Sequence, residues 1–152
     1  MCQVLHWANA TQVFREAYRV LKSNSFVVIY EDYFLWHADE ETPFMKWFRA
    51  SFQSRFPQPP RNRQSLNAQG EFAPTGFGFA GYEEYSHPES LTLDQLIEHL
   101  ITQSTVVSAV DQGGESLGHA VQWLQNELQI FFGATPQLTF PFGGDVYYLR
   151  RA

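Results

Sequence analysis

The alternation of apolar and polar residues between residues 9 and 24 predicts an amphipathic helix that ends in a tight turn. Apolar side chains recur at helical spacing, and charged residues occupy the opposite side, so one stripe is expected to face a core. The apolar positions are Val13, Phe14, Ala17, Tyr18 and Leu21. Asn9 and Gln12 favour a capping box at the start of the helix, and residues 22–24 provide its end.

Residues 26–30 form a continuous run of β-branched and aromatic side chains. Such a run is typical of a strand that is covered on both faces, as in a parallel α/β sheet. The run is followed directly by Glu31 and Asp32. Ligands of open α/β sheets bind beyond the carboxyl ends of the strands, so this acidic pair is a candidate site.

The remaining pattern predicts further helices and strands. In order, they are a helix over 43–56 capped by Thr42, a long loop over 61–81, a strand over 82–87, a helix beginning at a Thr92–Gln95 capping box, a helix over about 116–132 after Gly113–Gly114, and strand-like segments over 137–142 and 145–150. The last two segments are joined through Gly143 and Gly144, which form either a hairpin turn or a bulge.

The size and composition of the chain favour one globular domain over residues 1–152. Apolar residues make up 44% and aromatic residues 16%, which is enough for a sizeable core. The net charge is −6 with only 10 Lys and Arg, so nucleic acid is not an expected partner. No apolar run is long enough to span a membrane. The single Cys2 and the absence of a signal-peptide pattern predict a cytoplasmic location.

Three short motifs invite functional interpretations that their context disfavours. Residues 76–81 match G-x-G-x-x-G, but Pro74 precedes them and a strand-like segment follows, so a flexible loop is favoured over a nucleotide site. Residues 114–118 match the G-x-S-x-G nucleophile elbow, with residues 106–110 as its possible strand. Because no acid and His follow in the required order, Ser116 is better interpreted as a helix cap. His37 with the acidic residues 39–41 could bind a metal, but a solvated acidic loop is favoured.

Three consecutive segments of the chain resemble class I S-adenosylmethionine-dependent methyltransferases. Residues 3–7 end in the "HW" that follows the fourth strand of that family, residues 14–22 contain its E-x-x-R-V-L-K helix, and residues 26–30 match its fifth strand. The family usually has Pro-Gly-Gly at the turn where this chain has Ser-Asn-Ser over 23–25, and Asn also adopts the left-handed conformation. The resemblance implies an α/β fold that is the second half of a Rossmann-like methyltransferase sheet, with a helical insertion before the last strand.

The resemblance also implies where ligands bind. His6 and Trp7 would approach S-adenosylmethionine, or alternatively Trp7 packs on the following helix. Glu31 or Asp32 would be the general base if the methyl acceptor must lose a proton. Tyr33, Trp36, Trp47 and Phe48 could line a pocket for a small organic acceptor, although Trp47 and Phe48 also suit a helical core.

The resemblance covers only the C-terminal half of the family, because the Gly-rich cofactor turn belongs upstream of Gln3. We therefore expect a truncated methyltransferase-like protein that has an incomplete cofactor site and is inactive as an isolated chain. The alternative is a non-catalytic, self-associating module that binds small molecules. Residues 2–5 would form an unprotected strand edge, which predicts a homodimer in either case.

Overall fold

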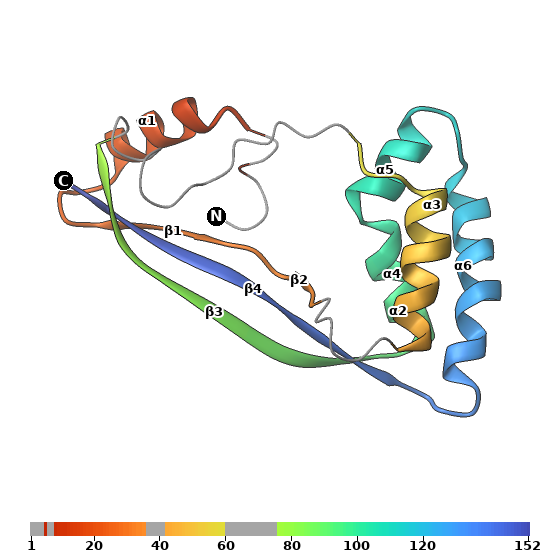
Figure 1. Cartoon of the computed structure of the whole chain (residues 1–152). Helices are drawn as coiled ribbons and strands as arrows, with labels where there is room; N and C mark the ends of the chain where they lie inside the picture. Colours follow the sequence, from red (N-terminus) through yellow and green to blue (C-terminus); the bar gives the residue numbers. More distant parts are fainter. Residues whose placement is uncertain (1–4, 6–7, 36–41, 60–75) are drawn as a thin grey trace. The chain divides into compact units, whose positions relative to one another are not determined.

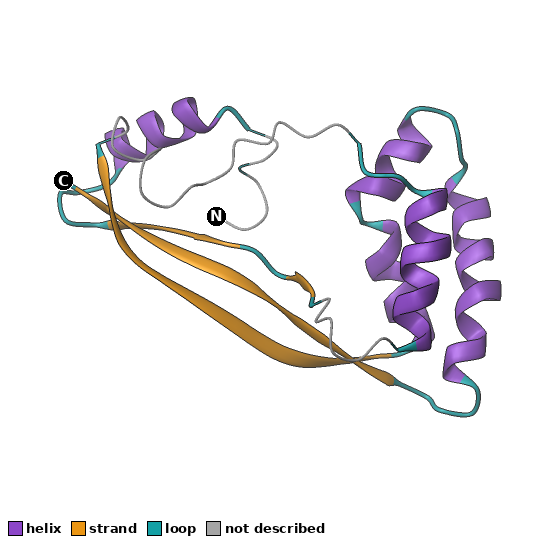
Figure 2. Cartoon of the chain, in the orientation of Figure 1, coloured by secondary structure: helices purple, strands orange, loops and turns teal. Residues whose placement is uncertain are grey.

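The computed structural model describes residues 5, 8–35, 42–59 and 76–152 (Figure 1). These residues belong to two compact units. The sheet unit comprises Met1–Leu35, Arg61–His87 and Pro141–Ala152, and the helical unit comprises Trp36–Pro60 and Pro88–Phe140. Figure 2 shows the helices and strands of the chain, and two of the strands contribute residues to both units. The prediction of a single domain over residues 1–152 stays a prediction.

The sheet unit contains helix α1 and a sheet of four strands. The elements are α1 (Ala10–Val20), β1 (Phe26–Tyr30), β2 (Tyr33–Phe34), β3 (Phe77–Leu91) and β4 (Leu138–Arg151). The strand order is β1-β4-β2, and β3 also pairs with β4. Both β1 and β2 run antiparallel to β4, with Val27 opposite Leu149 and Tyr33 opposite Gly143. The same register holds for both strands, so β2 continues the path of β1 after an interruption at Glu31 and Asp32.

Helix α1 begins and ends where the sequence predicts. The Asn9 side chain accepts a hydrogen bond from the backbone N–H of Gln12 at 3.2 Å. Arg19 provides a positive charge in the last turn. Asn24 adopts a positive φ of 66°, which confirms that asparagine can replace glycine in this turn.

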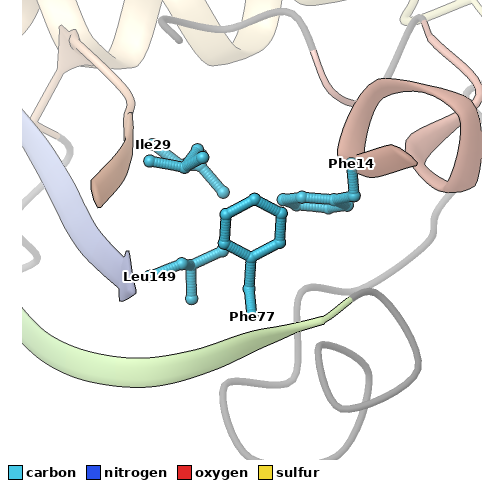
Figure 3. Packing of buried hydrophobic residues seen from close by; sticks show 5 residues of the cluster. Phe14, Ile29, Phe77 and Leu149 are labelled. Atoms are coloured by element: carbon cyan, nitrogen blue, oxygen red, sulfur yellow. The ribbon is translucent and has the colours of Figure 1, made fainter. Parts of the chain in front are cut away.

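The core of the sheet unit lies on the face that α1 covers. Its buried members are Phe14, Val27, Ile29, Phe77 and Leu149. Figure 3 shows the Phe77 ring lying among Ile29, Leu149 and Phe14. The Phe14 and Phe77 rings are 5.9 Å apart. Side chains alternate between the faces of a strand, so Val27 and Ile29 point to this face while Phe26 and Tyr30 are exposed.

Three predictions for the strands are wrong. Strand β1 is antiparallel to its partner and buried on one face only, although its residues form an unbroken apolar run. Strand β3 begins at Phe77, within the predicted loop, because the buried Phe77 ring fixes the chain against the core. The segments before and after Gly143 and Gly144 form one continuous strand β4 that keeps one register with β1 and β2, so the glycines form neither a hairpin nor a bulge against these strands.

Strand β4 passes unusually close to its neighbours at these two glycines. A Cβ atom on Gly143 would lie 2.1 Å from the carbonyl oxygen of Tyr85 in β3, and one on Gly144 would lie 2.3 Å from the carbonyl oxygen of Glu31. Both distances are far below van der Waals contact. Glycine is therefore required here for the backbone to approach on both sides.

The helical unit begins with one helical segment that contains a wider turn. It comprises α2 (Pro43–Trp47), a π-helical turn η1 (Phe48–Phe52) and α3 (Gln53–Arg55), and Thr42 caps its start as predicted. Its buried side chains are Phe44, Phe48, Phe52 and Phe56, spaced four residues apart. An α-helix has 3.6 residues per turn, so a strict four-residue repeat would drift around it. The π-helical turn keeps these rings on one face.

The other helices are α4 (Leu93–Ile101), α5 (Ser104–Asp111) and α6 (Leu117–Phe132). Both hydrogen bonds of the Thr92–Gln95 capping box are present, as predicted. The backbone N–H of Thr92 donates to the Gln95 side chain at 2.9 Å, and the backbone N–H of Gln95 donates to the Thr92 hydroxyl at 3.2 Å. The sequence pattern did not separate α5 from α4. Leu96, Leu100, Leu124 and Leu128 are fully buried in this unit, where α4 packs against α6. Every helix in the described ranges is too short or too polar to cross a bilayer.

Candidate functional site

Glu31 and Asp32 form the interruption between β1 and β2. The backbone N–H of Glu31 donates to the carbonyl oxygen of Asp145 at 3.1 Å, so the ladder with β4 continues through the interruption. Because side chains alternate along an extended chain, those of Glu31 and Asp32 lie on opposite faces of the sheet. The predicted acidic pair therefore belongs to two different constellations.

The constellation on the face of α1 centres on the Tyr82 hydroxyl. Its oxygen lies 2.7 Å from a carboxylate oxygen of Glu84 and 2.7 Å from one of Asp145. A hydroxyl has one hydrogen and donates to one of these carboxylates at a time. Hydrogen bonds to Glu84 and then to Asp145 raise the pKa of Tyr82, which keeps this phenol protonated.

Two further tyrosines lie near these carboxylates. Burial, followed by the charges of Asp145 and Glu31, raises the pKa of both Tyr33 and Tyr147. The Tyr147 and Tyr82 rings are 5.1 Å apart. We call this set the tyrosine–acid cluster, and its members are Glu31, Tyr33, Tyr82, Glu84, Asp145 and Tyr147. Its negative charge disfavours an anionic ligand on this face.

The constellation on the opposite face is a pair formed by Asp32 and His87. A carboxylate oxygen of Asp32 lies 3.2 Å from Nε2 of His87. The two side chains retain 38% and 36% of their accessible surface, so solutes can reach the pair. The His87 ring stacks at 6.1 Å on Phe142, whose ring lies 4.4 Å from that of Phe34. On this face an accessible acid–histidine pair therefore lies next to two buried phenylalanine rings.

His87 was missed as a functional residue by the sequence patterns. It is 55 residues from Asp32, and the only signal was its presence at the end of a predicted strand. Pairing of β2 and β3 on the two sides of β4 brings the two residues together.

The predicted site residues are only partly brought together. Glu31 and Tyr33 belong to the tyrosine–acid cluster on the face of α1, whereas Asp32 lies on the opposite face. Trp47 belongs to the helical unit, where its Nε1–H donates to Glu127 at 2.8 Å and its ring stacks on Trp123 at 5.7 Å. Phe48 is a core residue, as the alternative interpretation expected. The predicted ligand residues His6, Trp7 and Trp36 lie outside the described residues.

The structure also decides between interpretations of two glycine motifs. Ser116 accepts a hydrogen bond from the backbone N–H of His119 at 3.2 Å and caps α6. Residues 106–110 lie in α5 instead of a strand, which excludes a nucleophile elbow. Gly78 and Gly81 lie within β3, so the match to G-x-G-x-x-G opens no helix.

The described residues do not fit the donor S-adenosylmethionine. The Gly-rich turn that holds such a cofactor follows a strand and opens a helix. Within the described ranges, the glycines of residues 76–81 precede or lie in β3, and Gly113 and Gly114 stand between two helices. The same part of the chain contains no group of three or more His, Cys, Asp and Glu that could hold a metal ion. His37 and residues 39–41 lie outside it.

Comparison with known proteins identifies a related fold. No protein-family model matches the chain, and no curated protein matches it. A solved structure of a "Putative Type II Methyltransferase" from Anaeromyxobacter dehalogenans is similar, with a TM-score of 0.62 and 16% sequence identity. The match covers 98% of this chain and 62% of that protein, so this chain spans less than two thirds of its length. The predicted fold class, an α/β methyltransferase-like sheet with a helical insertion before the last strand, is confirmed.

Proposed function

We propose that these 152 residues form the acceptor side of an S-adenosylmethionine-dependent methyltransferase that acts on a small organic molecule. The observation that carries this proposal is the fold similarity, which extends over 98% of the chain to a methyltransferase-like structure. Fold alone does not define chemistry, and the candidate site adds the second argument. Acidic and aromatic side chains gather where β1 ends, and solutes can reach several of them.

The chain's contribution to the reaction is to bind and orient the acceptor. Methyl transfer needs the acceptor atom in line with the donor's methyl group, and good positioning alone lowers a barrier substantially. The donor supplies an electrophilic methyl group on a positively charged sulfur. In the sheet unit, Asp32 and Tyr33 follow the end of β1 on opposite faces of the sheet, and both remain accessible, at 38% for the Asp32 side chain and 37% for Tyr33.

The test measures methyl transfer by the protein. These 152 residues are expressed together with any flanking residues that the gene encodes. Radiolabelled S-adenosylmethionine is offered with panels of phenols, amines and carboxylic acids, and labelled product is separated by chromatography. We expect transfer to at least one panel. Asp32→Asn should lower this transfer, and its matched control is Asp94→Asn, which changes one carboxylate in the first turn of α4 instead of the site. Absence of transfer to every panel would contradict the proposal.

A non-catalytic, self-associating module is the second candidate function. The strand edge that the sequence predicts over residues 2–5 lies outside the described residues, apart from residue 5. Phe26 and Tyr30 on the uncovered face of β1 retain 51% and 40% of their accessible surface. Exposed apolar side chains of this kind favour association, and a two-fold axis is the commonest solution. Light scattering should then give twice the chain mass, whereas a stable monomer at high concentration would contradict the homodimer.

A further inference from the structure

The tyrosine–acid cluster occupies one area on the α1 face of the sheet. Its residues come from the end of β1, from β2, from β3 and from β4, and these strands meet through their pairing with β4 (Figure 1). Ile29 of the buried core stands opposite Tyr147 in the register, so the cluster begins where that core ends. Tyr33 and Tyr82 retain 37% and 46% of their accessible surface. Solutes can therefore reach the aromatic part of this face.

The three carboxylates of the cluster have no cationic side chain beside them in the described part of the chain. The ion pairs described there join other residues, which are Arg19 with Glu16, Arg55 with Glu115, His87 with Asp32, and His119 with Glu115. Glu84 and Asp145 share the Tyr82 hydroxyl, which has one hydrogen for two acceptors. One of these two carboxylates therefore always keeps an oxygen that this hydroxyl does not satisfy.

The carboxylates and the tyrosine rings are close enough to act on each other. Burial raises the pKa of Tyr33 and of Tyr147, and the charges of Asp145 and Glu31 raise it further. Each carboxylate thus disfavours a further negative charge on this face. A positive charge at the same place would be attracted by all three.

The tyrosine rings add a second attraction for a cation. The Tyr82 and Tyr147 rings lie 5.1 Å apart and are tilted by 47°, so together they present an angled aromatic surface. The face of a tyrosine ring carries partial negative charge and attracts a cation placed over it. Aromatic surfaces of this kind recognise ammonium groups that carry alkyl substituents, because the rings also contact the carbon atoms.

We propose that the tyrosine–acid cluster binds a small organic ammonium ion. The positive nitrogen would lie next to the carboxylates of Glu84 and Asp145, and its alkyl groups would contact the tyrosine rings. Charge complementarity is the argument for this occupant, since the face is acidic and aromatic and its carboxylates have no described cationic partner. The inference goes beyond the proposed function and needs no methyl donor.

A metal ion fits this face less well than an organic cation. Calcium and magnesium need several oxygen ligands that converge on one point at about 2.0–2.6 Å. Within the described ranges, no group of three or more His, Cys, Asp and Glu could hold a metal ion, so the carboxylates of the cluster do not converge in this way. An alkylammonium ion is larger, and its charge can be met from several directions without close coordination.

The experiment compares choline with neohexyl alcohol, in which a carbon atom replaces the charged nitrogen. The two molecules have nearly the same shape, so a difference in affinity reports the charge. In calorimetric titrations at constant ionic strength, we expect choline to bind at least about tenfold more tightly than the alcohol. The NMR ring signals of Tyr82 and Tyr147 should shift in a saturable manner as choline is added. Those of Tyr30, an exposed tyrosine on the other face of the sheet, should not shift.

The matched variants change neighbouring carboxylates of β3. Glu84 belongs to the cluster, whereas Glu83 accepts a hydrogen bond from the Tyr148 hydroxyl on the opposite face. Glu84→Gln and Glu83→Gln alter the net charge equally. We expect Glu84→Gln to weaken choline binding about fivefold and Glu83→Gln to weaken it less than about twofold.

Two substitutions of Tyr82 test the role of its ring. Tyr82→Phe keeps an aromatic face and should retain choline binding within about twofold, whereas Tyr82→Leu should weaken it about threefold or more. Circular dichroism verifies that each variant is folded. Equal affinities in these two variants would show that the ring does not bind the cation and would overturn the proposal.

The remaining outcomes also decide the proposal. No detectable binding of choline, or equal affinities for choline and the alcohol, would overturn it. Equal losses in Glu83→Gln and Glu84→Gln would overturn it as well, because a general surface charge affects both alike. If a lysine tripeptide shifts the tyrosine signals and choline does not, the face binds a basic peptide instead. None of these measurements involves methyl transfer, so the inference and the proposed function fail separately.

Discussion

Replacement of Gly144 by alanine should break the sheet where the candidate site lies. Gly144 stands opposite Asp32 in the register, and an added Cβ would lie 2.3 Å from the Glu31 carbonyl oxygen and 3.3 Å from the Tyr33 ring. The backbones would have to separate by about 1 Å to reach ordinary contact. This movement would also stretch the hydrogen bond from Glu31 N–H to Asp145, which is 3.1 Å long.

The expected loss of stability follows from these contacts. Overpacking typically costs about 1–3 kcal/mol, and a backbone hydrogen bond contributes about 1 kcal/mol. We therefore expect Gly144→Ala to lower the free energy of unfolding by about 2–4 kcal/mol. The ratio of unfolded to folded protein would rise by about 30-fold to several hundred-fold. Such a change is a large fraction of the stability of a typical domain, which is about 5–15 kcal/mol.

Urea unfolding followed by circular dichroism measures this loss. The matched control is Gly81→Ala, also in the sheet unit, where the nearest atom to an added Cβ is in the Tyr148 ring at an ordinary 3.7 Å. Gly81→Ala should change stability by less than about 0.5 kcal/mol. Equal midpoints for the two variants would refute the close approach of β4 to β1 that the argument requires.

Four further outcomes test the core, the caps, the titration and the donor site. Phe14→Ala should lower the free energy of unfolding by about 3–5 kcal/mol, because Phe14 is 2% exposed and packs on Phe77; a loss below 1 kcal/mol in urea unfolding would contradict this packing. Thr92→Ala removes the capping box of α4 and should cost about 1 kcal/mol by the same measurement, while Thr92→Ser should cost little. Burial and nearby carboxylates raise the pKa values of Tyr33 and Tyr147. The stability that these tyrosines contribute is therefore complete below about pH 10 and is lost as the pH rises through their folded-state pKa values. Thermal melting should show this decline, and the decline should be shallower in a Tyr33→Phe, Tyr147→Phe double variant. Calorimetric titration of these 152 residues with S-adenosylmethionine should give weak binding or none, because no described glycine turn follows a strand and opens a helix, and a low-micromolar Kd would show that this expectation is wrong.

The parts of the fold that could be predicted from the sequence are those decided by residues close together in the chain. Asn9, Thr92 and Ser116 each cap a helix through an N–H three residues away, so the signal and its partner stand in one short segment. Asn24 provides the positive φ that its turn requires. The methyltransferase-like order of strands and inserted helices was likewise indicated by motifs that span few residues.

The parts that could not be predicted depend on partners far along the chain. The run over residues 26–30 gives no sign that only Val27 and Ile29 are buried, because that depends on α1 and Phe77. The same holds for the start of β3, which Phe77 fixes by packing on Phe14. The pairing of Asp32 with His87 arises only when β2 and β3 flank β4. Composition and spacing contain none of this information.

The path of the chain between β3 and β4 has a consequence for how the protein folds. Ser90 near the end of β3 and Thr139 near the start of β4 are 49 residues apart, yet their hydroxyl oxygens are 2.9 Å apart. The rings of Tyr82 and Tyr147 are in contact further along the same two strands, so β3 and β4 are antiparallel. The segment that connects these strands contains α4, α5 and α6.

Bringing the ends of a flexible segment of this length together costs roughly 3 kcal/mol of chain entropy. If α4 packs on α6 first, the two ends are already held near each other, and most of that entropy is lost before any strand pairs. Formation of these local helices should therefore set the rate at which the sheet closes, since long-range strand pairing is otherwise slow. Residues of α4 and α6 that touch no ligand would then control how quickly Asp32 and His87 meet.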